Sequence, residues 1–153
     1  MRKSSLLIFT LILLLAAASF SQEQTDLAKY IAANYTKREV SIPMRDGVKL
    51  FTIIYEPKDK STKYPILFNR TPYSIGPYGP ANYAERLGPS TDLYPREGFI
   101  FVNQDVRGRF MSEGEFVNIR PDIPNTKPSE IDESTDAYDT IEWLLKNVAN
   151  NNG

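Results

Sequence analysis

Two apolar segments that run directly into sharp turns restrict the fold of this chain more than any other feature. Ile66–Tyr73 (ILFNRTPY) and Phe99–Gly108 (FIFVNQDVRG) begin with large apolar residues and end in polar residues marked by Pro or Gly. Short apolar runs bounded in this way are typical of buried strands. In sheets with parallel strands, ligand-binding and catalytic groups gather at the carboxyl ends of the strands. We therefore expect functional side chains at these two strand ends.

A hairpin and a helix flank the two segments. Glu39–Met44 alternates apolar and polar residues, and Val48–Tyr55 is rich in β-branched and aromatic ones. Asp46 and Gly47 between them are a strong short-range hairpin signal. Ser134–Asn147 has apolar residues at helical spacing, with acidic residues at its start, where the helix dipole favours them. This order of elements predicts an α/β sheet with an antiparallel edge.

The last helix also predicts a further strand. A helix that connects two parallel strands needs the second strand before its apolar face is covered. Only Val148–Gly153 follows the helix, so we expect the sheet to be incomplete and the chain to stop inside a β-α-β unit. This interpretation would be wrong if Ile141 and Leu144 were both enclosed by the chain's own residues.

The amino terminus has the pattern of a secretory signal peptide. Arg2 and Lys3 precede the apolar run Leu6–Ala18, and small residues at Ser19 and Ser21 follow. The run is shorter than the roughly 20 residues that a membrane-spanning helix needs. We expect residues 1–21 to be a signal peptide, residues 22–37 a helical lead-in and residues 38–153 one partial domain. The protein would be secreted or periplasmic, with no membrane segment after cleavage.

The composition of the chain limits the classes of molecule that it is expected to bind. The 18 basic and 19 acidic residues are interspersed without a basic stripe, which argues against a nucleic-acid partner. The chain has no Cys, so an exported form would depend on packing for its stability, without disulfides. Abundant Tyr and Pro suit a loop-rich extracellular enzyme and a β-rich binding module equally well.

Candidate nucleophiles and metal ligands are few. The chain has no His and no Gly-x-Ser-x-Gly sequence, and a serine is a weak nucleophile without a neighbouring base. We therefore assign no nucleophile. Asp132, Glu133, Asp136 and Asp139 lack the alternating ligand positions and the glycine of a calcium loop, so we interpret them as helix-capping residues. We expect no metal and no other cofactor.

The two strand ends supply the candidate site residues. Tyr73 could donate a hydrogen bond to an oxyanion that forms on a substrate carbonyl, and donors aimed in advance usually make the largest catalytic contribution. From residue type alone, a Tyr packed on the sheet edge with a wet hydroxyl is the more frequent role. Arg107 could grip a substrate carboxylate. We favour a structural role, in which Asp105 pairs locally with Arg107 or Arg109. Ser74–Arg96 is a long loop, and its interleaved tyrosines suggest that it is packed and walls a pocket.

Four segments in this order resemble the amino-terminal part of the X-Pro dipeptidyl-peptidase-like (S15) α/β-hydrolases, the family of cocaine esterase and the α-amino-acid ester hydrolases. They are Arg38–Phe51 (REVSIPMRDGVKLF), Asn69–Tyr73 (NRTPY), Phe101–Gly114 (FVNQDVRGRFMSEG) and Glu133–Gly153 (ESTDAYDTIEWLLKNVANNNG). The long insert Arg120–Ile131 is most similar to the ester hydrolase and acylase branch of the family.

The resemblance implies a secreted serine hydrolase that cuts ester or amide bonds of a small-molecule or peptide substrate through an acyl-serine intermediate. It implies for Tyr73 the role of oxyanion-hole donor. The nucleophilic Ser and the Asp and His of the triad lie further along such proteins, so none is assigned here and this piece alone is expected to be inactive. Two alternatives stay open: a non-catalytic secreted β-rich binding module, and a pseudoenzyme that ends at Gly153.

Overall fold

The structure, a computed structural model, describes residues 26–89, 92–124, 127 and 130–153. The predicted signal peptide, residues 1–21, lies outside these ranges. Within them, no helix is long and apolar enough to cross a membrane.

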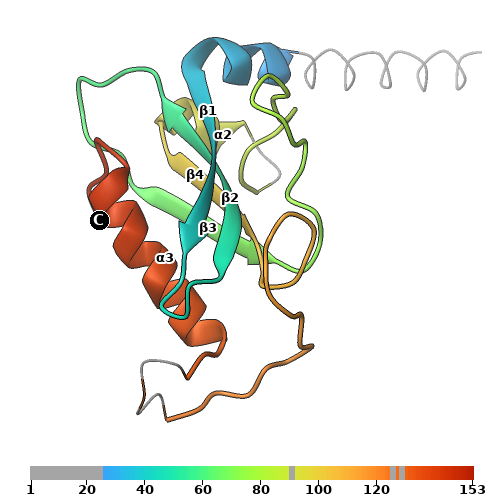
Figure 1. The fold of residues 1–153 in the computed structure, drawn as a ribbon. Coiled ribbons are helices and arrows are strands. Elements are labelled where there is room, and N and C mark those ends of the chain that lie inside the picture. Colours follow the sequence, from blue (N-terminus) through green and yellow to red (C-terminus); the bar gives the residue numbers. More distant parts are fainter. Residues whose placement is uncertain (1–25, 90–91, 125–126, 128–129) are drawn as a thin grey trace, which may run out of the picture.

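Four strands form one mixed sheet in the order β1-β2-β4-β3 (Figure 1). The strands are β1 (Tyr35–Pro43), β2 (Lys49–Pro57), β3 (Ile66–Thr71) and β4 (Ile100–Asp105). β2 pairs antiparallel with both β1 and β4, whereas β3 and β4 run parallel. The predicted α/β fold with an antiparallel hairpin edge is confirmed.

The β1–β2 hairpin turns where the sequence indicates. The backbone N–H of Gly47 donates to the carbonyl of Met44 at 2.9 Å, and Gly47 has a φ of 88°, a region that favours glycine. β1 begins at Tyr35, four residues before the predicted strand and inside the segment expected to be a helical lead-in. Tyr35 pairs with Pro57, and its buried hydroxyl donates to the carbonyl of Pro95 at 2.8 Å. Burial of this ring explains the early start of the strand.

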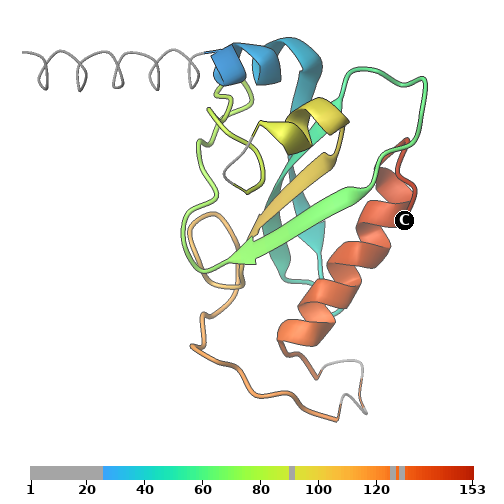
Figure 2. The ribbon, with the colours of Figure 1, turned by 180° about the vertical axis from the view of Figure 1, so that it is seen from behind.

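Each face of the sheet carries its own apolar cluster. On one face, Leu50, Ile54 and Val102 pack with Leu144 of α3 (Glu133–Asn147). On the other face, strand residues pack with the helix of residues 26–34 and with the loop that follows β3. Figure 2 shows α3 along one side of the sheet and the helix of residues 26–34 at the opposite end from the start of α3. The sheet therefore has two covered faces, as an α/β fold requires.

The short helix α2 (Leu93–Glu97) is not predicted by the sequence. It lies inside the segment that we expected to be a loop throughout, and Pro95 occupies its third position. The first turn of a helix tolerates proline because the N–H groups there have no partner within the helix. Pro95 made the segment resemble a loop in the sequence, but a proline at the third position of a helix is compatible with α2.

α3 begins with the predicted cap. The Asp132 carboxylate accepts from the backbone N–H of Thr135 at 2.8 Å, and the Thr135 hydroxyl accepts from the N–H of Asp132 at 2.9 Å. This reciprocal pair is a capping box, which satisfies two backbone donors that would otherwise lack partners. The interpretation of Asp132 as a capping residue is confirmed. No group of three or more His, Cys, Asp or Glu side chains in the described part of the chain could hold a metal ion.

After α3 the chain returns to the sheet beside β3. Asn151 forms a parallel bridge with Tyr64, in which the Tyr64 N–H donates to the Asn150 carbonyl at 2.7 Å and the Asn152 N–H donates to the Tyr64 carbonyl at 3.1 Å. Leu144 is buried, but Ile141 keeps 44% of its surface exposed. The chain's own residues thus do not enclose both side chains. α3 connects β4 to the start of a parallel pairing, as its apolar pattern predicts.

Candidate functional site

β3 and β4 both end at the same edge of the sheet (Figure 2). Tyr73 lies two residues beyond the end of β3. Its side chain is 77% exposed, and its backbone N–H donates to the Thr71 hydroxyl at 3.1 Å. The ring is therefore not packed against the sheet. An exposed phenol at this edge is available to a ligand, and its role as an oxyanion donor stays a prediction.

Hydrogen bonds join the two strand ends beneath Tyr73. Thr71 and Asp105 face each other in the parallel register, and the Val106 N–H donates to the Thr71 carbonyl at 3.2 Å. The Arg109 Nε donates to the carbonyl of Pro72 at 3.0 Å. The backbone on the amino-terminal side of Tyr73 is thus attached to the loop that follows β4. The two segments that the sequence marks as candidate sites form one edge.

Asp105, the last residue of β4, is buried beneath this edge. Its carboxylate accepts from the Tyr78 hydroxyl at 3.0 Å, from the Met111 N–H at 3.3 Å and from the Ile75 N–H at 3.4 Å. Burial raises the pKa of Asp105 above its ordinary value, and these hydrogen bonds only partly oppose the rise. Asp105 therefore connects the loop after β3 to the loop after β4.

Arg107 has the structural role that we favoured, but with other partners. Its guanidinium is 4% exposed and donates to Asp136 at 2.6 and 3.0 Å and to Asp46 at 2.7 Å. Burial alone would lower the pKa of Arg107, but the hydrogen bonds that it donates to Asp136 and Asp46 outweigh burial and raise this pKa. The predicted pairing with Asp105 is wrong. The strand ends at Asp105, and the turn that follows directs Arg107 to the α3 side of the sheet while Asp105 faces the loops.

Arg109, the other predicted partner of Asp105, also contacts different groups. Besides its bond to the Pro72 carbonyl, its guanidinium lies over the rings of Phe110 and Phe116, with its central carbon 5.3 and 5.0 Å from the ring centroids. Such cation–π contacts stabilise the guanidinium while leaving Asp105 to neutral donors. Phe110 itself has a φ of 46°, an uncommon left-handed conformation for a bulky residue, and it is 54% exposed.

The loop after β3 is packed, as its tyrosines suggest. Tyr78 contacts Phe51, and Tyr83 contacts Tyr55, each in an edge-to-face arrangement. The fully buried Lys37 ammonium donates to three loop carbonyls at 2.7 to 2.8 Å and pairs with Glu39 at 2.8 Å. These carbonyls belong to Pro77, Gly79 and Asn82. A single buried cation therefore organises the part of the loop that the sequence marks with Gly and Pro.

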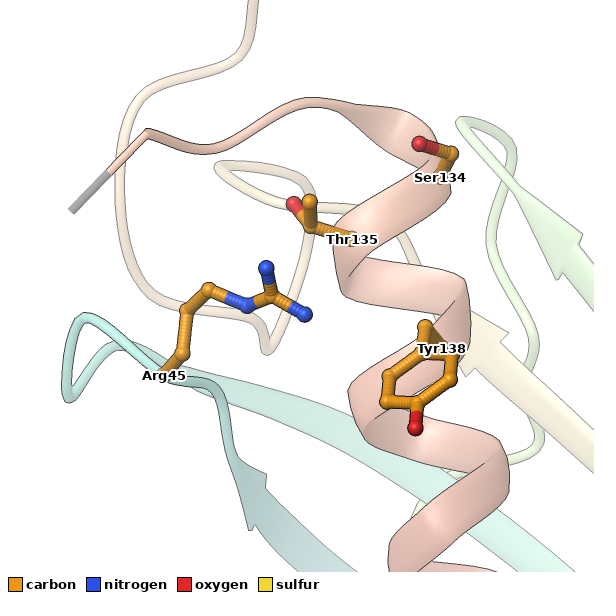
Figure 3. A pocket seen from close by; sticks show the side chains of 4 residues that line it. All are labelled: Arg45, Ser134, Thr135 and Tyr138. Carbon is orange, nitrogen blue, oxygen red and sulfur yellow. The ribbon is translucent and has the colours of Figure 1, made fainter. Parts of the chain in front are cut away.

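A hollow of about 310 Å³ lies elsewhere, at the start of α3. Figure 3 shows its lining residues, with the side chain of Arg45 directed toward α3 near Thr135. Asp139 already holds the Arg45 guanidinium at 2.8 and 3.0 Å. The sequence did not mark this hollow, and its lining includes no acid or base able to activate a hydroxyl. We assign no chemistry to it.

Sequence reasoning gave Asp105 a structural role with the wrong partners, and it missed the contacts that Tyr78 and Lys37 make in the site. An acid that ends an apolar strand is a signal that could have marked Asp105. Lys37 gives no such signal, because an isolated lysine in an alternating strand is usually on the solvated face. Among the described residues, the Ser134 hydroxyl donates to the carboxylate of the capping residue Asp132 at 2.7 Å, and the chain has no His.

Comparison with known proteins agrees with this architecture. A model of the X-Pro dipeptidyl-peptidase (S15) family matches residues 46–153. Cocaine esterase from Rhodococcus sp. (strain MB1 Bresler) is 34% identical over 122 residues, which cover 76% of this chain and 18% of the esterase. The chain therefore spans about a fifth of the length of this relative.

Two solved structures share the fold. An α-amino acid ester hydrolase is 43% identical, with a TM-score of 0.62 over 78% of this chain and 20% of that protein. An aminopeptidase from a marine sediment Thaumarchaeota archaeon is 40% identical, with a TM-score of 0.60 over the same shares. The family model covers the β1–β2 turn, both strand ends and α3. On these grounds the chain belongs to the X-Pro dipeptidyl-peptidase (S15) family of hydrolases.

Proposed function

We propose that this chain forms the amino-terminal part of the catalytic domain of a secreted serine hydrolase. The substrate is a peptide, an amino-acid ester or a related acyl compound, and the bond is cleaved through an acyl-serine intermediate. Family membership supports this proposal, as do relatives named as an esterase, an ester hydrolase and an aminopeptidase. No cofactor is needed for this chemistry.

The observation that carries the proposal is the position of Tyr73. Its exposed phenol stands at the carboxyl ends of two parallel strands, where α/β folds bind their ligands. When a nucleophile attacks a carbonyl, negative charge develops on the carbonyl oxygen, and a fixed hydroxyl donor stabilises that charge. Tyr73 would keep its proton and act only as a donor, so it needs no neighbouring base.

The remaining catalytic groups are not in this chain. A seryl nucleophile needs a base beside it, and the sequence contains no His. We therefore expect the 153-residue chain alone to show no hydrolase activity. Activity would require a nucleophile, a base and an acid from another segment, brought to the open side of β3.

A chimera tests the role of Tyr73. Residues 46–153 replace the matching segment of the α-amino acid ester hydrolase, and turnover is measured for the chimera and for its Tyr73→Phe variant. Loss of one oxyanion donor lowers kcat on the order of 100-fold or more, with little change in KM. Tyr138→Phe is the matched control, because this tyrosine is also exposed but lies on α3. If the Tyr73→Phe variant of an active chimera turned over at the unsubstituted rate, the assignment would be wrong.

The rival function, a binding module with tyrosine-lined loops, has less support. Such a module presents its aromatic rings to a partner. Here Tyr78 and Tyr83 use their rings against Phe51 and Tyr55, and their hydroxyls bond to Asp105 and to the Lys37 N–H. These tyrosines are committed to the interior of the chain, which favours the hydrolase.

Export is a separate part of the proposal and rests on the sequence of residues 1–21. Fusion of residues 1–30 to a reporter that is active only outside the cytoplasm tests it. We expect the reporter to be exported and cleaved near Ser21, and replacing Leu13 and Leu14 with Arg to abolish export. Retention of the unsubstituted fusion in the cytoplasm would contradict this part of the proposal alone.

A further inference from the structure

We propose that Asp105 is the positioning residue that sets the direction of the Tyr73 phenol. This inference rests on the proposed function, because it assumes that Tyr73 is the oxyanion donor. It assigns to a buried carboxylate the task of holding an exposed ring in place.

An exposed ring needs such a residue. Tyr73 is 77% exposed, so packing against neighbours cannot fix its orientation. Its direction must come from the backbone on either side. On the amino-terminal side, Arg109 holds the Pro72 carbonyl at 3.0 Å. On the carboxyl-terminal side, Ser74 and Ile75 need an equivalent attachment.

Asp105 provides that attachment along two routes. One carboxylate oxygen accepts directly from the Ile75 N–H at 3.4 Å. The carboxylate also accepts from the Tyr78 hydroxyl at 3.0 Å, and that hydroxyl accepts from the Ser74 hydroxyl at 3.2 Å. The Ser74 oxygen in turn accepts from the Gly76 N–H at 3.1 Å. The residue next to Tyr73 is therefore connected to the end of β4.

The same residue holds the opposite loop. Its carboxylate accepts from the Met111 N–H at 3.3 Å, and its backbone carbonyl accepts from the Ser112 hydroxyl at 2.6 Å. The Ser112 oxygen also accepts from the Phe51 N–H of β2 at 2.8 Å. Asp105 thus joins the loop after β3 and the loop after β4 to the sheet, and β4 is the rigid element that supports both loops.

The chemistry of the site requires a carboxylate. Its three donors are a hydroxyl and two backbone N–H groups, so both oxygens must accept. An asparagine has the same shape but directs its NH₂ group at one of these donors. Asp105→Asn therefore keeps the volume of the side chain but removes one of the two acceptor oxygens. Tyr78→Phe removes one donor to Asp105 while keeping the ring contact with Phe51.

Amide hydrogen exchange in the full chain tests the inference without any activity. We expect the amides of residues 75 and 111 to exchange about tenfold faster or more in Asp105→Asn, because their hydrogen bonds to a charged acceptor are weakened or lost. In Tyr78→Phe we expect the same for the amides of residues 74–76, because the hydroxyl that connects Ser74 to Asp105 is removed. Tyr83→Phe is the matched control, since this hydroxyl lies in the same loop but accepts from the Lys37 N–H. Unchanged exchange in a folded Asp105→Asn chain would overturn the inference. If that variant does not fold, unchanged exchange in Tyr78→Phe would overturn it instead.

Turnover of the chimera separates this inference from the proposed function. If Asp105 acts through Tyr73, Asp105→Asn lowers kcat with little effect on KM, and it has no further effect in a Tyr73→Phe background. A full additional loss in that background would overturn the positioning role. Faster exchange together with unchanged turnover in both single variants would support the attachment of the loops but refute the oxyanion role of Tyr73.

Discussion

Two buried carboxylates, Asp136 and Asp105, lie in the molecule in contrasting surroundings. Asp136 in the first turn of α3 receives two hydrogen bonds from Arg107, and Arg70 lies 3.7 Å away. Asp105 at the end of β4 receives its bonds from neutral donors, and burial raises its pKa. Breaking a buried ion pair is costly, so the first arrangement serves stability, whereas perturbed carboxyls of the second kind are frequent at functional sites. The contrast separates a structural cluster from a candidate catalytic edge.

Removing the cation of the structural cluster should have the largest effect. Arg107→Met leaves the buried Asp136 and the partly exposed Asp46 without the guanidinium of Arg107. We expect the free energy of unfolding to fall by about 3–5 kcal/mol, as for other broken buried pairs. Denaturant unfolding measures this loss. A loss of unfolding free energy below about 1 kcal/mol would mean that Arg107 contributes no more than an exposed ion pair does. The distinction between a stabilising cluster around Asp136 and the edge around Asp105 would then be wrong.

Gly108 connects the two regions, and a side chain there should disturb both. It has a φ of 68°, and an added Cβ would collide with the backbone nitrogen of Phe116. Left-handed backbone costs an L-residue about 1–2 kcal/mol, and overpacking against atoms that cannot move adds about 1–3 kcal/mol. We expect Gly108→Ala to lower the unfolding free energy by about 2–5 kcal/mol. Gly47→Ala is the control, because nothing lies within 4 Å of an added Cβ there.

Lowering the pH should affect carboxylates that are bonded to arginine differently from Asp105, which is bonded to neutral donors. Although burial opposes it, hydrogen bonds from Arg107 and Val48 lower the pKa of Asp46, and those from Arg45 lower the pKa of Asp139. Both groups therefore contribute stability above their ordinary pKa of 3.8, and this stability is lost as the pH falls through their lower folded values. The folded pKa of Asp105 is raised, so its ionisation costs stability as the pH rises above 3.8.

On acidification, we therefore expect the loops around Tyr73 to become more stable as Asp105 takes up its proton, at a higher pH than that at which the domain loses the contributions of Asp46 and Asp139. NMR-detected exchange at residues 75 and 111, followed against pH beside global unfolding by circular dichroism, measures the order of events. Simultaneous transitions in the two measurements would show that Asp105 does not titrate separately from Asp46 and Asp139.

The smallest effect should come from Arg45. Its guanidinium bonds to Asp139 at 2.8 and 3.0 Å, but the two side chains are 28% and 15% exposed. Exposed pairs contribute about 0–1 kcal/mol, so Arg45→Met should lower the unfolding free energy by no more than that. The variant is also the control for Arg107→Met, since both remove a guanidinium from a partner near α3. Equal losses in the two variants would mean that burial does not distinguish the pairs.

The strong local signals in the sequence predicted much of the fold. Asp46 and Gly47 located the hairpin, and the spacing of Ala137, Leu144 and Val148 located α3. The strand ends were less predictable. Both β3 and β4 continue through polar residues that looked like turns, because these residues pair with one another across the parallel register, as Asn69 does with Asn103.

The site was predictable in position but not in contacts. Tyr73 was placed at a strand end from Pro72 and the apolar run before it. The partners of Asp105 and Arg107 could not be inferred, because they depend on the face that each side chain takes after β4 ends. Neighbours along the chain are natural candidates for pairing, yet Arg107 bonds to residues 61 and 29 positions away.

Because of Lys37, the loop beyond Tyr73 needs no bound metal ion to hold its carbonyl groups together. Its ammonium group, enclosed by the carbonyls of Pro77, Gly79 and Asn82, occupies the kind of oxygen cage in which many extracellular proteins keep a dissociable ion. Here the charge is covalently attached to β1, so neither dilution nor a chelator can remove it. The conformation of this loop should therefore not depend on the concentration of metal ions in the surrounding solution.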